Sequence, residues 1–86
     1  MKNSIITKAL NDYLYKMDGF FPEINEEGEI ECEVDNFARS LPETAPFLKA
    51  LKEQSTEHGN VAGAVYYIIS GVTVYMVYSW ERFMGI

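Results

Sequence analysis

The acidic side chains of this sequence are concentrated in one segment, where their spacing has a chemical consequence. Residues 18–35 hold eight carboxylates and no base, a charge of -8, whereas the rest of the chain holds seven bases and five acids. From Glu29 to Asp35 every second residue is acidic and the residues between are apolar, a period of two that predicts a β-strand. Carboxylates on one face of that strand would stand about 6.6 Å apart. Such a row of like charges attracts a basic partner over a long range.

We therefore expect the partner-binding carboxylates to be those of the hairpin that contains this strand. They are Glu26, Glu27, Glu29, Glu31, Glu33 and Asp35. The alternative is that these carboxylates form only a solvated outer face, which keeps the chain in solution and prevents edge-to-edge pairing of strands.

The same segment resembles the start of an EF-hand calcium loop, with Glu23, Asn25, Glu27 and Gly28 in the spacing of that motif. The twelfth position of the motif, which needs a bidentate Glu, falls on Val34. The alternation of apolar residues through that position fits a strand better than a calcium loop. We therefore expect neither a metal nor a cofactor.

Cys32 and His58 are the only cysteine and the only histidine of the chain. A Cys–His nucleophile pair needs the two side chains within hydrogen-bond reach. Cys32 alternates inward with apolar residues, and a buried thiol is inert. One histidine cannot build a His-based zinc site, and no Gly-rich phosphate loop is present. We expect a protein that is not an enzyme and has no catalytic residues.

Aromatic residues towards the end of the chain form a second candidate surface. A two-residue turn at Ser70-Gly71 would make Tyr66 and Tyr75 cross-strand neighbours, on the hairpin face opposite the core. Trp80 would end the second strand of that hairpin. Aromatic side chains with a polar tip are enriched at interfaces. Tyr66, Tyr75 and Trp80 are therefore candidates for contact with a partner or with a second copy.

The elements that position these residues follow from hydrophobic periodicity and turn residues. They are a helix over 4–17, a hairpin over 20–35, a helix over 44–57, and strands over 61–69 and 72–80. This α-β-β-α-β-β order predicts an α+β fold, in which two helices cover one face of a four-stranded antiparallel sheet and no element covers the other. Residues 1–86 make one small domain. Because residues 60–80 carry no charge, a long helix or a membrane span is the alternative to the last two strands.

Composition narrows the classes of function. A net charge of -6 and a pI near 4.6 disfavour direct contact with nucleic acid or an anionic membrane. A single cysteine, and the lack of a continuous apolar run in the first fourteen residues, indicate the cytoplasm. We expect a small acidic binding protein that inhibits a basic partner, such as a nuclease or another nucleic-acid-binding protein, by occluding its surface.

Analogy of size and charge relates such a protein to three classes of inhibitor. A phage anti-defence protein of the anti-CRISPR type, acting as a nucleic-acid mimic, is favoured slightly over a toxin-immunity protein or an antitoxin. The alternative from another class is a homodimeric structural or small-ligand-binding protein that uses the aromatic sheet face.

Overall fold

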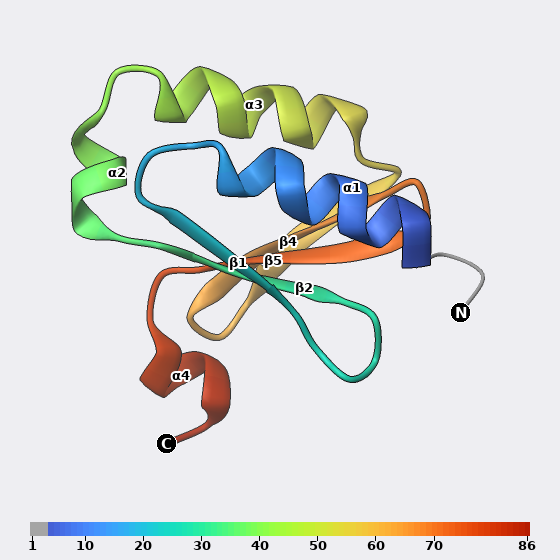
Figure 1. The fold of residues 1–86 in the computed structure, drawn as a ribbon. Coiled ribbons are helices and arrows are strands. Elements are labelled where there is room, and N and C mark those ends of the chain that lie inside the picture. Colours follow the sequence, from blue (N-terminus) through green and yellow to red (C-terminus); the bar gives the residue numbers. More distant parts are fainter. Residues whose placement is uncertain (1–3) are drawn as a thin grey trace.

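The architecture is an α+β fold built on one mixed sheet, seen in a computed structural model that describes residues 4–86 (Figure 1). The elements are α1 (Ser4–Tyr15), β1 (Phe20–Ile24), β2 (Ile30–Val34), α2 (Asn36–Ser40), α3 (Thr44–Gln54), β3 (Glu57–Val61), β4 (Ala64–Ile69), β5 (Val72–Val77) and α4 (Trp80–Met84). Within these described residues the strands form a five-stranded sheet in the order β1-β2-β5-β4-β3. Neighbouring strands are antiparallel except β2 and β5, which are parallel.

Helices α1 and α3 cover one face of the sheet, as predicted, and enclose the hydrophobic core (Figure 1). Ile30, Cys32 and Val34 of β2 all point into this core, which confirms the alternation predicted for that strand. Leu14 of α1 and Leu51 of α3 close the core from the helical side. The opposite side chains of β2 are therefore turned away from both helices.

The prediction of a four-stranded antiparallel sheet is wrong in one strand and in one pairing. Residues 57–61, where the sequence pattern predicts a helix end, form the edge strand β3. None of the residues of this strand is buried and it lacks apolar alternation, so backbone pairing with β4 holds it rather than side-chain burial. The parallel pairing aligns Ile30 with Val74. It joins segments separated by α2, α3, β3 and β4, a long connection of the kind that parallel strands require.

A turn at Ala62-Gly63 divides the stretch predicted as one strand over 61–69. Gly63 has a φ of +76°, and a Cβ at this position would meet the backbone oxygen of Ser79. The backbone oxygen of Gly63 accepts hydrogen bonds from the N–H groups of Tyr78 and Ser79, at 2.8 and 3.0 Å. This turn therefore requires glycine, and it ties the start of β4 to the end of β5.

The hairpin of β4 and β5 has the predicted register, with Tyr66 opposite Tyr75. Both turn residues, Ser70 and Gly71, have positive φ angles of 52° and 80°, as in a type I′ hairpin turn. Residues 60–80 are thus mainly strands and turns, and the alternative of a long helix or helical membrane span is wrong. In the part of the chain that the structure describes, no helix has both the length and the apolar character needed to cross a bilayer.

The face of the sheet turned away from α1 and α3, called the open face below, is partly covered, contrary to the prediction. β5 ends at Val77 instead of continuing to Trp80. The chain then turns, and the short helix α4 lies on the other side of the sheet from α1 and α3 (Figure 1). The Ser79 hydroxyl caps this helix by accepting the N–H of Arg82 at 3.4 Å. A serine in this position favours starting a helix over continuing the strand.

Candidate partner-binding face

The register of the sheet places acidic and aromatic side chains in one row across the open face. Glu23 of β1 lies opposite Glu31 of β2. Glu31 is paired with Tyr75 of β5, which in turn lies opposite Tyr66 of β4. Paired residues in a sheet point to the same side, so all four side chains share the open face. An acidic half over β1 and β2 therefore adjoins an aromatic half over β4 and β5.

Glu23 and Glu31 face each other across antiparallel strands, and directly opposed like charges destabilise a sheet. Within residues 4–86, no base forms an ion pair with either carboxylate. Among residues 4–86, the one ion pair joins Lys8 and Asp12 on the exposed surface of α1. The carboxylates of the hairpin are therefore available to a cationic group from outside the chain.

Asn25, in the turn between β1 and β2, fixes two carboxylates beside the aromatic half. Its Nδ2 donates to Glu29 Oε1 at 3.1 Å and to Glu31 Oε2 at 3.0 Å. Its Oδ1 accepts the backbone N–H groups of Glu27 and Glu29 at 3.0 and 2.9 Å. One side chain therefore both shapes the turn and holds two carboxylates side by side.

Four rings, those of Tyr66, Tyr75, Phe83 and Trp80, form a continuous aromatic row on the open face. The ring centroids are 6.5 Å apart for Tyr66 and Tyr75, 5.2 Å for Tyr75 and Phe83, and 5.7 Å for Phe83 and Trp80. Tilted and edge-to-face contacts at these separations are the arrangements that aromatic pairs prefer. The row therefore continues from the sheet onto α4.

Trp80 connects the aromatic row to the acidic half of the face. Its Nε1 donates to Glu33 Oε1 at 3.0 Å, which draws the indole towards β2. Trp80 thus lies on the open face at the start of α4, and not at the end of a strand as predicted.

The two tyrosines of the row have different surroundings. The Tyr75 hydroxyl lies 3.5 Å from Glu29 Oε2, and burial, followed by the charge of Glu29, raises the pKa of Tyr75 above its ordinary value. The Tyr66 hydroxyl donates to Glu57 Oε2 at 2.7 Å, and this hydrogen bond is the main cause that raises the pKa of Tyr66. The Tyr66 ring also lies over Gly59, where an added Cβ would be 2.9 Å from it. Tyr66 is therefore held against edge strand β3, while Tyr75 adjoins the carboxylates.

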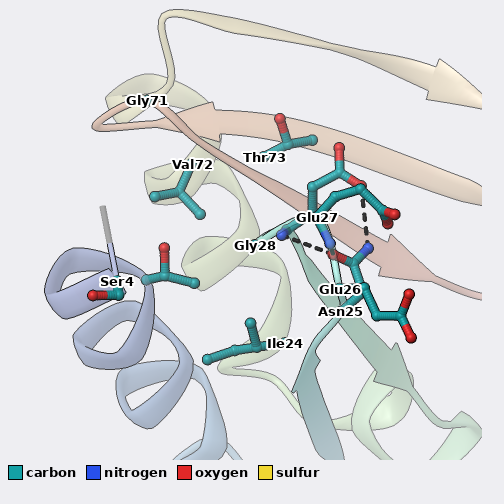
Figure 2. A pocket seen from close by; sticks show the side chains of 11 residues that line it. Ser4, Ile24, Asn25, Glu26, Glu27, Gly28, Gly71, Val72 and Thr73 are labelled. Atoms are coloured by element: carbon teal, nitrogen blue, oxygen red, sulfur yellow. Dashed lines mark hydrogen bonds between the residues drawn. The ribbon is translucent and has the colours of Figure 1, made fainter. Parts of the chain in front are cut away.

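Two hollows flank the turn between β1 and β2. One, of about 480 Å³, lies between that turn, the first turn of α1 and the start of β5, with Ile24 in its lining (Figure 2). The other, of about 300 Å³, lies on the open face. Its lining includes Glu29, Glu31, Tyr75 and Phe83. This second hollow combines carboxylates with aromatic rings.

The six acids expected to bind a partner do not form one row. The structure distributes them over the exposed turn (Glu26 and Glu27), the position before β2 (Glu29), the open face of β2 (Glu31 and Glu33) and the start of α2 (Asp35). Asp35 caps that helix, since its Oδ1 accepts the Ala38 N–H at 2.9 Å. The row stops because β2 ends at Val34, so the expectation that Asp35 continues it is corrected.

Three residues of the open face were missed by the sequence analysis. Glu23 could have been found, because placing Ile24 opposite Ile30 on the core side of the hairpin brings Glu23 opposite Glu31. Asn25 was recognisable as a turn residue but not as the donor to two carboxylates. Phe83 depends on the position of α4, which no periodicity in the sequence marks.

Cys32 and His58 do not meet. Cys32 is buried in β2, His58 is exposed in β3, and two strands lie between them, a separation of about 14 Å at the usual strand spacing. Burial raises the pKa of the Cys32 thiol to about 12, which keeps it protonated near neutral pH. Within residues 4–86, no three His, Cys, Asp or Glu side chains are arranged to hold a metal ion. Val34, where an EF-hand needs its bidentate Glu, is buried in the core.

No protein-family model, curated protein or solved structure matches this chain. The class of protein therefore follows from the fold and the open face alone. They define a small α+β domain in which a partly exposed aromatic row adjoins carboxylates that no base of the described residues pairs with.

Proposed function

We propose that this protein is a non-enzymatic inhibitor that binds a basic protein and occludes its surface. The partner chemistry that fits best is the cationic nucleic-acid channel of a nuclease or of another nucleic-acid-binding protein, whose phosphate contacts come from Lys and Arg. In this proposal the acidic half of the open face takes the place of the phosphates. The aromatic row supplies the apolar anchor that protein interfaces need.

The observation that carries the proposal is the opposed pair Glu23 and Glu31, with Glu29 and Glu33 nearby and no base paired with any of them in residues 4–86. Repulsion among these carboxylates lowers the stability of the free hairpin. A cationic surface would relieve that repulsion on binding. It would also be steered towards the hairpin by the local surplus of negative charge.

The biological class favoured slightly is a phage anti-defence protein of the anti-CRISPR type, ahead of a toxin-immunity protein or an antitoxin. This preference rests on analogy of size and charge. All three classes would act by occluding a basic surface of the target. A panel of target enzymes from these classes therefore tests the occlusion mechanism.

The test is inhibition of purified basic nucleases, drawn from restriction, CRISPR-effector and bacteriocin enzymes, on a fluorescent DNA substrate. Glu23→Lys/Glu27→Lys changes two exposed acids of the hairpin whose side chains accept no hydrogen bond that the fold uses. We expect this variant to weaken inhibition about tenfold or more, and wild-type inhibition to fall as salt is raised. The matched control Glu43→Lys/Glu53→Lys makes the same charge change around α3 and should inhibit like the wild type. Inhibition of no enzyme in the panel, or equal inhibition by both variants, would contradict the proposal.

The alternative function is that of a homodimer that pairs through the aromatic sheet face. The exposed side chains of Phe21 and Val61, 51% and 40% accessible, extend the apolar area at both edges of that face and favour this alternative. Face-to-face pairing of two copies would, however, bring the same carboxylates together, so charge favours a basic partner. Sedimentation would decide between them, because a stable dimer that Tyr75→Asp dissociates would support the homodimer.

A further inference from the structure

We infer that the hollow on the open face receives an arginine side chain of the basic partner. This inference rests on the proposed function and specifies the chemistry by which the partner is recognised. The hollow has a volume of about 300 Å³, and its lining includes the acids Glu29 and Glu31 and the aromatic residues Tyr75 and Phe83, with Glu27, Val61 and Ala62 beside them. A guanidinium group complements both linings, because it is a cation with a flat, weakly hydrated face.

The carboxylate side of the hollow is already arranged in the free protein. The Asn25 amide nitrogen donates to one oxygen of Glu29 and one oxygen of Glu31, at 3.1 and 3.0 Å. These two carboxylates are partly exposed, and no base of residues 4–86 pairs with them. Because the two side chains are held before binding, less conformational entropy is lost when a cation arrives. The fork of N–H donors on a guanidinium can serve two carboxylate groups at once.

The aromatic side of the hollow is formed by two residues with rings, Tyr75 and Phe83. Tyr75 and Phe83 are tilted by 57° with their centroids 5.2 Å apart, and both are partly exposed. A guanidinium within about 6 Å of a ring centroid is attracted by the negative face of the ring. The Glu29 carboxylate, 3.5 Å from the Tyr75 hydroxyl, adds to the negative potential over that ring.

The chain itself contains one arginine stacked on a tyrosine in this manner. The Arg39 guanidinium lies 4.8 Å from the centroid of the Tyr78 ring, and its Nη2 donates to the Tyr78 carbonyl oxygen at 2.9 Å. Arg39 thus contacts a ring face and donates to an oxygen at the same time, as we infer for the partner arginine in the hollow.

Lysine fits the hollow less well than arginine. The lysine ammonium is a compact, strongly hydrated charge without a planar face, so it would gain attraction from the carboxylates and little from the rings. The arginine assignment therefore predicts a preference between two side chains of equal charge, which a purely electrostatic acidic surface would not show.

The experiment titrates three blocked peptides, Gly-Gly-X-Gly-Gly with arginine, lysine or citrulline at X, into the isotope-labelled protein and follows backbone and Trp80 indole resonances by NMR. We expect the arginine peptide to bind about fivefold more tightly than the lysine peptide. Citrulline, which has a similar shape but no charge, should not bind measurably. The shifts should centre on Glu31, Tyr75 and Phe83.

Four variants test whether the preference for the arginine peptide arises at the rings of the hollow. Tyr75→Phe keeps the ring and should retain it, whereas Tyr75→Leu and Phe83→Ala should each reduce arginine binding about fivefold. The control Tyr15→Leu removes a ring of α1 that is 70% exposed and should change nothing. Phe83 lies outside the sheet, so Phe83→Ala remains informative even if Tyr75→Leu does not fold.

Equal affinity for the arginine and lysine peptides, binding of neither, or a preference that both ring variants retain would overturn the arginine assignment. The nuclease assay is independent of these outcomes. Inhibition of a nuclease without an arginine preference would support occlusion and contradict the arginine site. An arginine preference without inhibition of any nuclease would support the arginine site and contradict the proposed function.

Discussion

Trp80 donates its indole N–H to the Glu33 carboxylate at 3.0 Å, although 47 residues separate the two in the chain. This hydrogen bond joins α4 to β2 across the open face. None of the residues of α4 is fully buried, so the helix is held by a small number of such contacts. The position of Trp80, at one end of the aromatic row, therefore depends in part on one acid of the hairpin.

Replacing that acid should release the helix. We expect Glu33→Ala to lower the free energy of unfolding by about 1–2 kcal/mol, because a hydrogen bond to a charged acceptor is lost. The emission of Trp80, the only tryptophan, should shift to longer wavelength as the indole becomes hydrated. Chemical denaturation and fluorescence measure both effects. The exposed acid Glu53 provides the control, since Glu53→Ala should leave the emission unchanged. An unchanged spectrum in Glu33→Ala would contradict the observed contact.

Replacement by alanine should affect stability differently at Gly59, in β3, and at Gly63, in the turn that follows β3. At Gly59 an added Cβ meets only the outer atoms of the Tyr66 ring, which can move aside, so we expect Gly59→Ala to change stability by less than about 1 kcal/mol. Displacing that ring should weaken the hydrogen bond to Glu57 and lower the pKa of Tyr66 towards its ordinary value.

At Gly63 the same change should be severe. A side chain there is strained by a φ of +76° and meets backbone atoms that cannot give way, so we expect a loss of about 2 kcal/mol or more. Thermal unfolding of the two variants and a tyrosine titration of Gly59→Ala measure these effects. Similar losses in both variants would show that the turn does not impose the strain described.

Asp35 should behave as a structural residue and not as a binding residue. Its carboxylate accepts the Ala38 N–H at 2.9 Å, so Asp35→Ala should destabilise the protein by about 1 kcal/mol, whereas Asp35→Asn keeps an oxygen acceptor and should not. Asp35→Asn should also bind the basic partner with unchanged affinity, unlike Glu31→Gln. Urea denaturation and the nuclease assay separate the two roles. Weaker inhibition by Asp35→Asn would return this acid to the binding surface.

The thiol of Cys32 should make the protein less stable at alkaline pH. Burial raises its pKa from 9.0 to about 12, so above pH 9 the unfolded chain loses a proton that the folded chain retains. Stability from this group is complete below pH 9 and decreases as pH rises towards 12, by at most about 1.4 kcal/mol per pH unit. The stability advantage of wild type over Cys32→Ala should therefore shrink between pH 8 and pH 10, as measured by denaturant unfolding. A constant difference would contradict the burial of the thiol.

Local sequence patterns were sufficient for the parts of the fold that short-range interactions control. The alternation of Ile30, Cys32 and Val34 with acids defined β2 and its buried face, since side chains on a strand alternate whatever their partners. Ser70-Gly71 defined the register of the last hairpin, because a two-residue turn leaves one way to align its strands. The excess of acids in residues 18–35 was also visible without a structure.

Tertiary structure alone decided which of these features meet. Edge strand β3 has no apolar alternation and forms because β4 offers unpaired backbone groups. The parallel pairing that sets Glu31 beside Tyr75 joins distant segments, and no local preference encodes it. Helix α4 brings Phe83 onto the open face through contacts with Tyr75 and through the bond from Trp80 to Glu33. The sequence by itself thus determined the distribution of charge, the buried face of β2 and the register of β4 with β5. The hollow that joins carboxylates to rings arises from long-range packing, because its walls come from segments that only the folded sheet brings together.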